Sequence, residues 1–194
     1  MSKNKIYIHE TALVENPLNI GTGSKVWHWT HICKEAKIGK NCSFGQNVYV
    51  ANNVDIGNNV KVQNNVSIYD EVSLGDNVFC GPSMVFTNVV NPRSVIERKE
   101  EYKKTIVSEG VSFGANCTII CGIEVGSYSF IAAGAVVNKN VKPYELMAGV
   151  PAKRIGWISE YGETMKFDSK GLFICDHTGD KYILENDLVS KIQQ

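Results

Sequence analysis

The stretch KIGKNCSFGQNVYVANNVDIGNNVKVQNNVSIYDEVSL, residues 37–74, places an apolar side chain at every sixth position. The same step continues in both directions, from Ile8 to Phe86, without one polar residue in this phase. At the apolar frequency of the chain, such a run has a chance on the order of one in a hundred thousand. The six-residue period is therefore a property of the fold.

A second small or apolar residue follows four places after each of these positions, beginning with Ala12, Leu18 and Ser24. Asparagine, which tolerates the left-handed backbone of a sharp corner, often stands just before this second residue. Each hexad therefore predicts a short strand and a corner, and three hexads make one triangular coil. We expect an all-β parallel β-helix with αL corners at Asn41, Asn47, Asn53, Asn59, Asn65 and Asn77.

The period is interrupted once and ends before the C-terminus. The step from Phe86 to Val107 is not a multiple of six, so residues 88–106 are predicted to leave the coil as a loop. Pro143 and Pro151 end the regular hexads, and a capping turn or short helix is expected after them. We expect a β-helix domain at 1–156 and, at 157–194, a cap with a small β-appendage of two or three short strands.

Composition excludes several classes of partner. The 20 basic and 20 acidic side chains balance, which argues against nucleic acid or an anionic membrane as a partner. The N-terminus has no signal-peptide pattern and no apolar run is long enough for a membrane span, so a cytoplasmic location is expected. The six cysteines lack metal-ligand spacing, so we expect free buried thiols and no metal requirement.

Two C-terminal segments, FIAAGAVV at 130–137 and AGVPAKRIG at 148–156, resemble the hexapeptide-repeat acyltransferases. This resemblance implies a left-handed coil and acetyl-CoA as co-substrate. In that family such segments line the pantetheine channel, where small residues allow close approach and basic residues meet phosphates. The residues implicated here are Ala133, Gly134, Ala135, Lys139, Gly149, Pro151, Ala152, Lys153 and Arg154. Corner geometry and a solvated cap are the alternative explanations of the same residues.

A closer resemblance covers most of the coil through VWHWTHIC at 26–33, VFCGPSMVFTN at 78–88 and EYKKTIV at 101–107. These runs are similar to the UDP-2-acetamido-3-amino-2,3-dideoxyglucuronate N-acetyltransferases of surface-polysaccharide synthesis. The resemblance places Asn88 beside the acceptor amine. The dTDP-3-amino-3,6-dideoxyhexose N-acyltransferases share this architecture and are the alternative at the level of the substrate.

Further candidates come from residues that interrupt the plain hexad pattern. His28, next to Trp27, is a candidate base or substrate contact, and an ordinary surface or interface histidine is its alternative. Arg93 and Arg98 in the loop suit a diphosphate or a carboxylate, unless they are merely solvated. Gln63, Asn64 and Tyr69 suggest a polar groove between subunits, although asparagine ladders explain the amides equally well.

The reaction expected from this resemblance is transfer of an acetyl group from acetyl-CoA to the 3-amino group of a nucleotide-linked sugar. It needs little help from a general base, because a neutral amine attacks a thioester directly and the departing thiolate can take the proton. An O-acetyltransferase would need an essential histidine to deprotonate a hydroxyl. A γ-type carbonic anhydrase needs three zinc-binding histidines, and no histidine occurs between His31 and His177. A non-catalytic solenoid does not explain the arginine-bearing loop. We also expect a homotrimer, because three prisms side by side would bury flat faces and form clefts for CoA and the nucleotide sugar.

Overall fold

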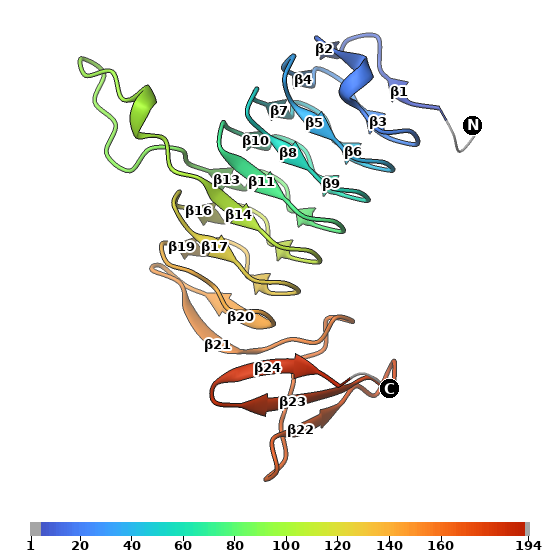
Figure 1. Ribbon diagram of the computed structural model, residues 1–194, viewed down its shortest axis with the longest axis vertical. Helices are drawn as coiled ribbons and strands as arrows, with labels where there is room; N and C mark the ends of the chain where they lie inside the picture. Colours follow the sequence, from blue (N-terminus) through green and yellow to red (C-terminus); the bar gives the residue numbers. More distant parts are fainter. Residues whose placement is uncertain (1–4, 193–194) are drawn as a thin grey trace.

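The computed structural model describes residues 5–192 and confirms the predicted β-helix. Short parallel strands wind into a triangular prism with three sheets, a loop projects from its side, and a small antiparallel sheet lies at its C-terminal end (Figure 1). No helix in the described part of the chain is long and apolar enough to span a bilayer.

The first side of the prism is a nine-stranded sheet in the order β1-β3-β6-β9-β12-β15-β18-β20-β21. All its neighbours are parallel except β20 and β21. Its strands are β1 (Tyr7–Ile8), β3 (Lys25–Val26), β6 (Ser43–Phe44), β9 (Lys61–Val62), β12 (Phe79–Cys80), β15 (Ser112–Phe113), β18 (Phe130–Ile131), β20 (Glu145–Ala148) and β21 (Lys153–Trp157).

The other two sides are a seven-stranded and a five-stranded parallel sheet. The seven-stranded sheet contains β2 (Leu13–Val14), β4 (His31–Ile32), β7 (Tyr49–Val50), β10 (Ser67–Ile68), β13 (Val85–Phe86), β16 (Thr118–Ile119) and β19 (Val136–Val137). The five-stranded sheet contains β5 (Lys37–Ile38), β8 (Asp55–Ile56), β11 (Val72–Leu74), β14 (Thr105–Val107) and β17 (Glu124–Val125).

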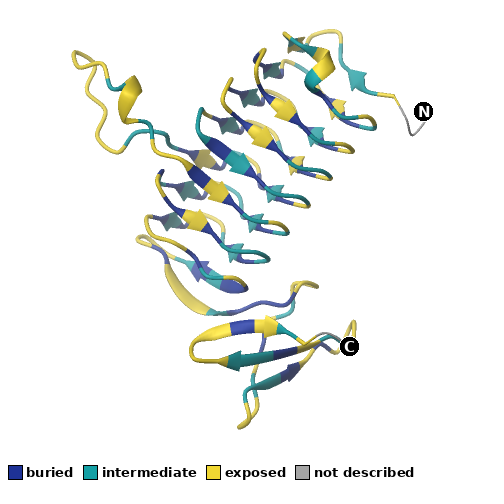
Figure 2. Cartoon of the chain, viewed as in Figure 1, coloured by how far each residue is buried: buried dark blue, intermediate teal, exposed yellow. Residues whose placement is uncertain are grey.

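The six-residue period produces one continuous core. Each inward residue stacks on its counterpart one coil away, as Val26 pairs with Phe44 and Phe44 with Val62. Both inward positions of most hexads are buried in this column, which extends along the prism (Figure 2). At about 25 cal/mol per Å² of apolar surface removed from water, this shared column is the main source of stability. A coil contributes to it only when its neighbours are folded.

The corners follow the predicted backbone with one exception. Asn41, Asn47, Asn59, Asn65 and Asn77 have positive φ, but Asn53 does not, and in the next coil Glu71 adopts φ 70° at that position. The prediction for Asn53 was therefore wrong.

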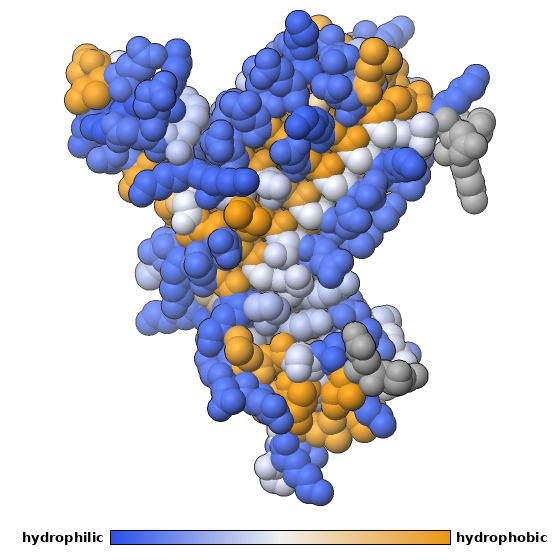
Figure 3. Space-filling model, in the orientation of Figure 1, coloured by the Kyte–Doolittle hydropathy of each residue, from blue (hydrophilic) through white to orange (hydrophobic). Residues whose placement is uncertain are grey.

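Glycine has a different role at the edge between the five-stranded and nine-stranded sheets. A Cβ built on Gly39 would lie 2.5 Å from the carbonyl oxygen of Gly57, so only glycine allows the coils to stack this closely. Figure 3 shows a pale stripe along the prism beside a hydrophobic one.

The first coil is less regular than the sequence suggested. Its third side is a 3₁₀ turn, η1 (Pro17–Asn19), instead of a strand, and an isolated bridge joins Ile20 to Ile38. Leu18 lies on this turn with 93% of its surface exposed, so its predicted inward position was wrong. A terminal coil has a neighbour on one side only, and a strand there gains fewer contacts.

The loop between β13 and β14 is shorter at its far end than predicted, because Thr105 and Ile106 already pair in β14. A backbone hydrogen bond of 2.9 Å from Lys103 to Asn88 closes its base. The loop contains a 3₁₀ turn, η2 (Lys99–Glu101), and projects away from the prism (Figure 1).

The expected cap after Pro143 is built from strands instead of a helix. β20 and β21 form an antiparallel pair, and β22 (Leu172–Ile174), β23 (Lys181–Glu185) and β24 (Leu188–Lys191) form a separate antiparallel sheet. A second hydrophobic cluster lies beneath this sheet and includes Tyr144 from the last coil as well as Trp157 and Tyr182. Because Tyr144 belongs to both parts, the domain boundary at 156/157 stays a prediction.

Candidate functional site

Two long edges of the prism carry most of the predicted site residues. The first edge comprises the turns from the nine-stranded to the seven-stranded sheet, at residues 27–29, 45–47, 63–65, 81–83, 114–116 and 132–134. The second edge comprises the turns from the seven-stranded to the five-stranded sheet, at residues 33–35, 51–53, 69–71, 120–122 and 138–140, together with the loop. The seven-stranded sheet lies between them.

An aromatic cluster occupies the N-terminal end of the first edge. The ring of His28 packs at a tilt of 30° against that of His9, with centroids 3.6 Å apart, and the ring centroid of Trp27 lies 5.3 Å from that of Tyr7. Trp29 adds a further exposed ring, since 60% of its surface is accessible. Neither ring nitrogen of His28 has a hydrogen-bond partner among residues 5–192. This cluster offers flat apolar surface and a free imidazole, which suits stacking on a planar ligand.

Gln63 and Asn64 lie on the same edge two coils further on. The side-chain oxygen of Asn64 accepts a hydrogen bond of 2.9 Å from the backbone N–H of Gln46. Asn64 therefore has a structural task at the corner. Gln63 is half-buried and remains the better candidate for contact with a ligand.

The second edge carries Tyr69, Asn88 and Lys139. Tyr69 is exposed and packs beside Tyr49, with ring centroids 6.0 Å apart. Asn88 stands where the loop leaves the prism, and its carboxamide makes no hydrogen bond within the described residues. The preceding residue is fixed in place, because Thr87 Oγ1 accepts a hydrogen bond of 3.0 Å from the backbone N–H of Cys121. Asn88 thus presents an unused amide from a rigid position.

One chain does not bring His28 and Asn88 together. They lie on different edges, and β4 and β13 are three strands apart in the seven-stranded sheet. At the usual strand spacing this separates them by about 14 Å along the prism. Both residues can act on one substrate only if it is long or if two chains share the site.

The segments predicted to meet CoA lie together at the C-terminal end. The backbone N–H of Val136 donates a hydrogen bond of 3.0 Å to the carbonyl of Gly149. The carbonyl of Val136 accepts a hydrogen bond of 2.7 Å from the backbone N–H of Ala152. Gly134 has no atom near the place where a Cβ would stand. Ala133, Gly134, Gly149 and Pro151 are exposed. Ala135 and Ala152 point into the core instead, so their side chains are closed to a ligand.

The basic residues of this end divide into two groups. Lys139 and Lys153 are exposed and make no ion pair in the region from residue 5 to 192, which leaves them available for phosphates. Arg154 is engaged: its guanidinium lies 2.7 Å from Asp187 and 3.3 Å from Glu145, and 4.5 Å from the centre of the Trp157 ring. Arg154 therefore anchors the C-terminal sheet. To make its predicted contact with CoA, it would have to break its ion pair with Asp187 or Glu145.

Asp187 is held by two cations, since Lys142 Nζ also lies 2.6 Å from it. Hydrogen bonds from Arg154 first, and from Lys142 second, lower the pKa of Asp187 to about 2.

The loop arginines are also occupied. Arg98 forks onto both carboxylate oxygens of Glu101 at 2.7 Å, and Arg93 donates to the carbonyl of Pro92. Their predicted role in binding a diphosphate or carboxylate stays untested. The chain has three arginines, and each has an acceptor within the chain.

The sheet between the two edges is nearly free of charge. Its outward residues are Leu13, His31, Tyr49, Ser67, Val85, Thr118 and Val136. The other two sheets carry lysine, aspartate or glutamate outward, for example Lys25, Lys61, Lys37, Asp55 and Glu124.

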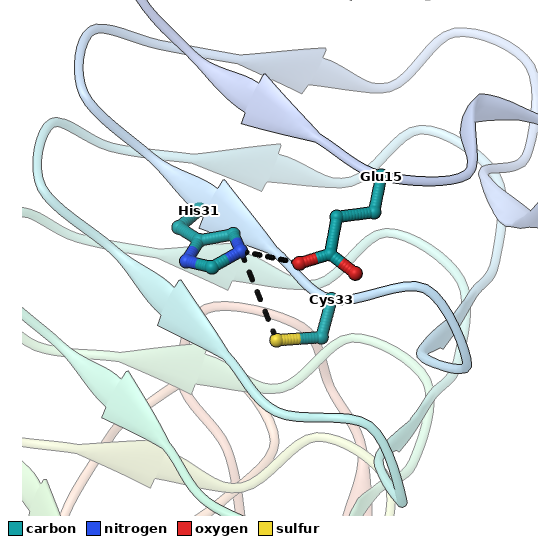
Figure 4. Close-up of side chains that lie close together, drawn as sticks. All are labelled: Glu15, His31 and Cys33. Carbon is teal, nitrogen blue, oxygen red and sulfur yellow. Dashed lines mark hydrogen bonds and ion pairs between the residues drawn. The ribbon is translucent and has the colours of Figure 1, made fainter.

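Sequence reasoning missed some neighbours of the predicted residues. His9 precedes Trp27 by one coil, and Tyr7 pairs with Lys25 just before the edge, so the period itself could have revealed them. Glu15, His31 and Cys33 form a cluster near the start of the second edge (Figure 4). Cys33 stands one coil after Glu15, so the period could also have placed these two side by side. The prediction of free cysteines is confirmed for all six.

The six-residue period and the stacked parallel β-helix define a protein of the hexapeptide-repeat class. The family model for the hexapeptide repeat of succinyl-transferase matches residues 35–70 and 104–139. A dTDP-3-amino-3,6-dideoxy-α-D-galactopyranose 3-N-acetyltransferase from Aneurinibacillus thermoaerophilus is 41% identical over 192 residues, which cover 98% of this chain and 97% of the relative.

Two further relatives match in part. A 2,3,4,5-tetrahydropyridine-2,6-dicarboxylate N-acetyltransferase from Brevibacillus brevis is 38% identical over 80 residues, 41% of this chain and 31% of that protein. The crystal structure of a hexapeptide-repeat acetyltransferase from Vibrio cholerae O1 biovar eltor, complexed with acetyl coenzyme A, superposes with a TM-score of 0.51 and 26% identity. That match covers 60% of this chain and 70% of the other.

The chain belongs to the hexapeptide-repeat acyltransferases. This membership confirms the predicted enzyme class, an acyl-CoA-dependent N-acyltransferase with acetyl-CoA as co-substrate. The comparisons support a nucleotide-sugar amino N-acetyltransferase, and the name of the full-length relative agrees with the alternative stated above and not with the uridine-linked glucuronate that was expected first.

Proposed function

We propose that this enzyme transfers the acetyl group of acetyl-CoA to the 3-amino group of a dTDP-3-amino-3,6-dideoxyhexose, with the galacto sugar as its first candidate. The observation that carries the proposal is the 41% identity to an enzyme of that name over nearly the whole of both chains. The reaction would take place in the cytoplasm and supply a sugar for surface polysaccharide.

The arginines favour a sugar without a 6-carboxylate. Binding a uronate commonly uses a guanidinium fork aimed at the carboxylate. Here Arg98 is paired with Glu101 and Arg154 with Asp187. A neutral 6-methyl group makes no such demand and fits the weakly charged surface of the seven-stranded sheet.

The chemistry needs orientation more than acid or base catalysis. The neutral 3-amine attacks the thioester carbonyl carbon, the carbon–sulfur bond breaks, and CoA leaves as a thiolate. The proton lost by the nitrogen can pass to this thiolate, whose conjugate thiol has a pKa near ~8.5 by analogy with cysteine. Asn88 would accept a hydrogen bond from the amine through its amide oxygen and direct the nitrogen lone pair at the thioester.

The proposed site lies between two chains of a homotrimer. The small-residue turns around Gly134 and Gly149 would hold the pantetheine arm, with Lys139 and Lys153 near the phosphates. The loop of one chain would approach the first edge of its neighbour, so that Asn88 and the aromatic cluster of His28 serve one substrate. The nearly uncharged seven-stranded sheet supports this packing, because burying it costs little desolvation of charge.

The test is a comparison of two acceptors. Purified enzyme and acetyl-CoA are incubated with dTDP-3-amino-3,6-dideoxygalactose or with UDP-2-acetamido-3-amino-2,3-dideoxyglucuronate, while CoA thiol release and product mass are followed. We expect kcat/KM to be at least about a hundredfold higher for the dTDP sugar, because the 6-carboxylate of the UDP-uronate would be left without a partner in the site. Light scattering on the same sample should give three chains per particle.

The outcomes separate the levels of the proposal. Preference for the UDP-uronate would overturn the substrate but keep the reaction. Turnover of hydroxyl sugars with neither amine accepted would overturn N-acyl transfer itself. A monomer with full activity would overturn the shared site.

A further inference from the structure

Three side chains with different donor atoms converge at the N-terminal end of the second edge. Glu15 follows β2, and His31 and Cys33 lie on and just after β4 in the adjacent coil (Figure 4). His31 Nε2 is 2.8 Å from Glu15 Oε1 and 3.9 Å from Cys33 Sγ. All three donor atoms lie within 4.8 Å of one another.

The arrangement does not fit a nucleophile with a charge relay. In such a relay the histidine uses one ring nitrogen for the nucleophile and the other for the carboxylate. Here the thiol and the carboxylate both approach Nε2. Three donor atoms within 4.8 Å of one another are instead spaced closely enough to share one cation.

The geometry points to a zinc site formed by Glu15, His31 and Cys33. Imidazole nitrogen, thiolate sulfur and carboxylate oxygen are all common zinc ligands, and the mixed set suits a borderline-soft ion better than magnesium or calcium. Three protein ligands leave a fourth tetrahedral position for water. The site lies three strands from Asn88 and does not rest on the proposed acyl transfer.

The carboxylate is already oriented for this task. Glu15 Oε2 accepts a hydrogen bond of 3.0 Å from the backbone N–H of Lys34, which leaves Oε1 directed at His31. Cys33 is buried at 7% exposure, and its Sγ lies 3.6 Å from the hydroxyl of Tyr49. Only small side-chain movements would bring the three donors to zinc distances of about 2.0–2.3 Å.

A metal here would join the first coil to the second. The attachment of the first coil is incomplete, since its third side is the η1 turn with an isolated bridge in place of a strand. Zinc would therefore stabilise the open N-terminal end against fraying, by an amount that grows with the logarithm of its affinity for the folded chain.

The experiment titrates zinc alone into the full-length protein after chelator treatment, with calorimetry for stoichiometry and cobalt absorption for thiolate ligation. We expect one Zn²⁺ per chain, a cobalt–thiolate charge-transfer band and a rise in Tm with zinc. Cys33→Ser and Glu15→Gln should each weaken binding by more than about tenfold, since even outer-shell changes cost this much. Cys121→Ser and His177→Asn are the matched controls.

The result has two clear readings. Stoichiometric binding that depends on Cys33 and Glu15 but not on Cys121 or His177 supports the site. Absence of stoichiometric binding, or binding unchanged in both Cys33→Ser and Glu15→Gln, overturns it. Glu15 is a surface residue, so its variant keeps the test valid if Cys33→Ser does not fold.

Discussion

The backbone N–H of Lys103 donates a hydrogen bond of 2.9 Å to the carbonyl of Asn88. This bond ties the end of the projecting loop to its beginning, so the loop cannot pull Asn88 away from the prism. Asn88 keeps its carboxamide free while its backbone is fixed. A catalytic amide gains most from such preorganisation, because its ordering is complete before the substrate arrives.

Asn88→Ala should lower kcat by about a hundredfold, in the range for loss of one orienting hydrogen bond at a reacting centre. KM for acetyl-CoA should stay near its original value, since the thioester is held elsewhere. Steady-state kinetics with the dTDP amino sugar check this. Asn91→Ala, a loop amide beyond the closed base, serves as the control, and a kcat within twofold of the parent enzyme would argue against any role for Asn88.

His28→Asn should act on binding of the nucleotide sugar. Loss of a stacking ring costs about 1–3 kcal/mol for a nucleobase, so KM for the acceptor should rise about tenfold with kcat little changed. A general base would behave differently, with kcat falling by about 10²–10⁴. The two parameters measured separately therefore decide between the roles, and His177→Asn provides a histidine that lies outside the prism.

Gly134→Asn should raise KM for acetyl-CoA about tenfold or more without unfolding the coil. Gly134 has φ 71°, and Asn116 occupies the same corner one coil earlier with φ 55°, so asparagine is compatible with the backbone. The added side chain would enter the space proposed for pantetheine. The reverse substitution, Asn116→Gly, should leave KM for acetyl-CoA unchanged. An equal rise of KM in both variants would mean that a change of backbone flexibility at the corner, and not the added side chain, is the cause.

Asp187→Asn should loosen the C-terminal sheet in a pH-dependent manner. Arg154 and Lys142 hold the pKa of Asp187 at about 2, below the usual unfolded value near ~3.9. Its stabilising contribution is therefore complete above pH ~4 and is lost as the pH falls toward 2. The parent protein should melt at a higher temperature than the variant at neutral pH, and this gap should close between pH 4 and 2.

Thermal melts across this pH range provide the measurement. Asp176→Asn is the matched control, since the Asp176 carboxylate makes no ion pair in the described part of the chain. A gap that persists unchanged at pH 2 would mean that the carboxylate charge is not the cause.

The sequence predicted what depends on repetition. Val26, Phe44 and Val62 share one environment because each coil is the template for the next, so a period of six identifies the core directly. The prediction failed where the template is incomplete. Leu18 belongs to a coil without an outer neighbour, and its hexad forms a turn that leaves the side chain in solvent.

Contacts between non-repeating parts were out of reach for a different reason. Arg154 carries a basic charge in a motif associated with phosphates, but its partner Asp187 stands on the turn between β23 and β24. No periodicity links the two positions, and the pairing depends on how two separate hydrophobic clusters dock. The cluster of Glu15, His31 and Cys33 is different, because the coil period itself places Cys33 beside Glu15 in the adjacent coil.

The stacking of identical coils gives the molecule a fixed unit of length. The aromatic cluster around His28 and the glycine turn around Gly134 lie on the same edge, so the span between them is a whole number of strand spacings of about 4.8 Å. Insertion or deletion of one complete coil would lengthen or shorten this span by one unit and keep every side chain on its own face. Removal of a single hexad would instead move all later residues to a different side of the prism. The distance between the two ends of the edge can therefore change only in steps of one whole coil.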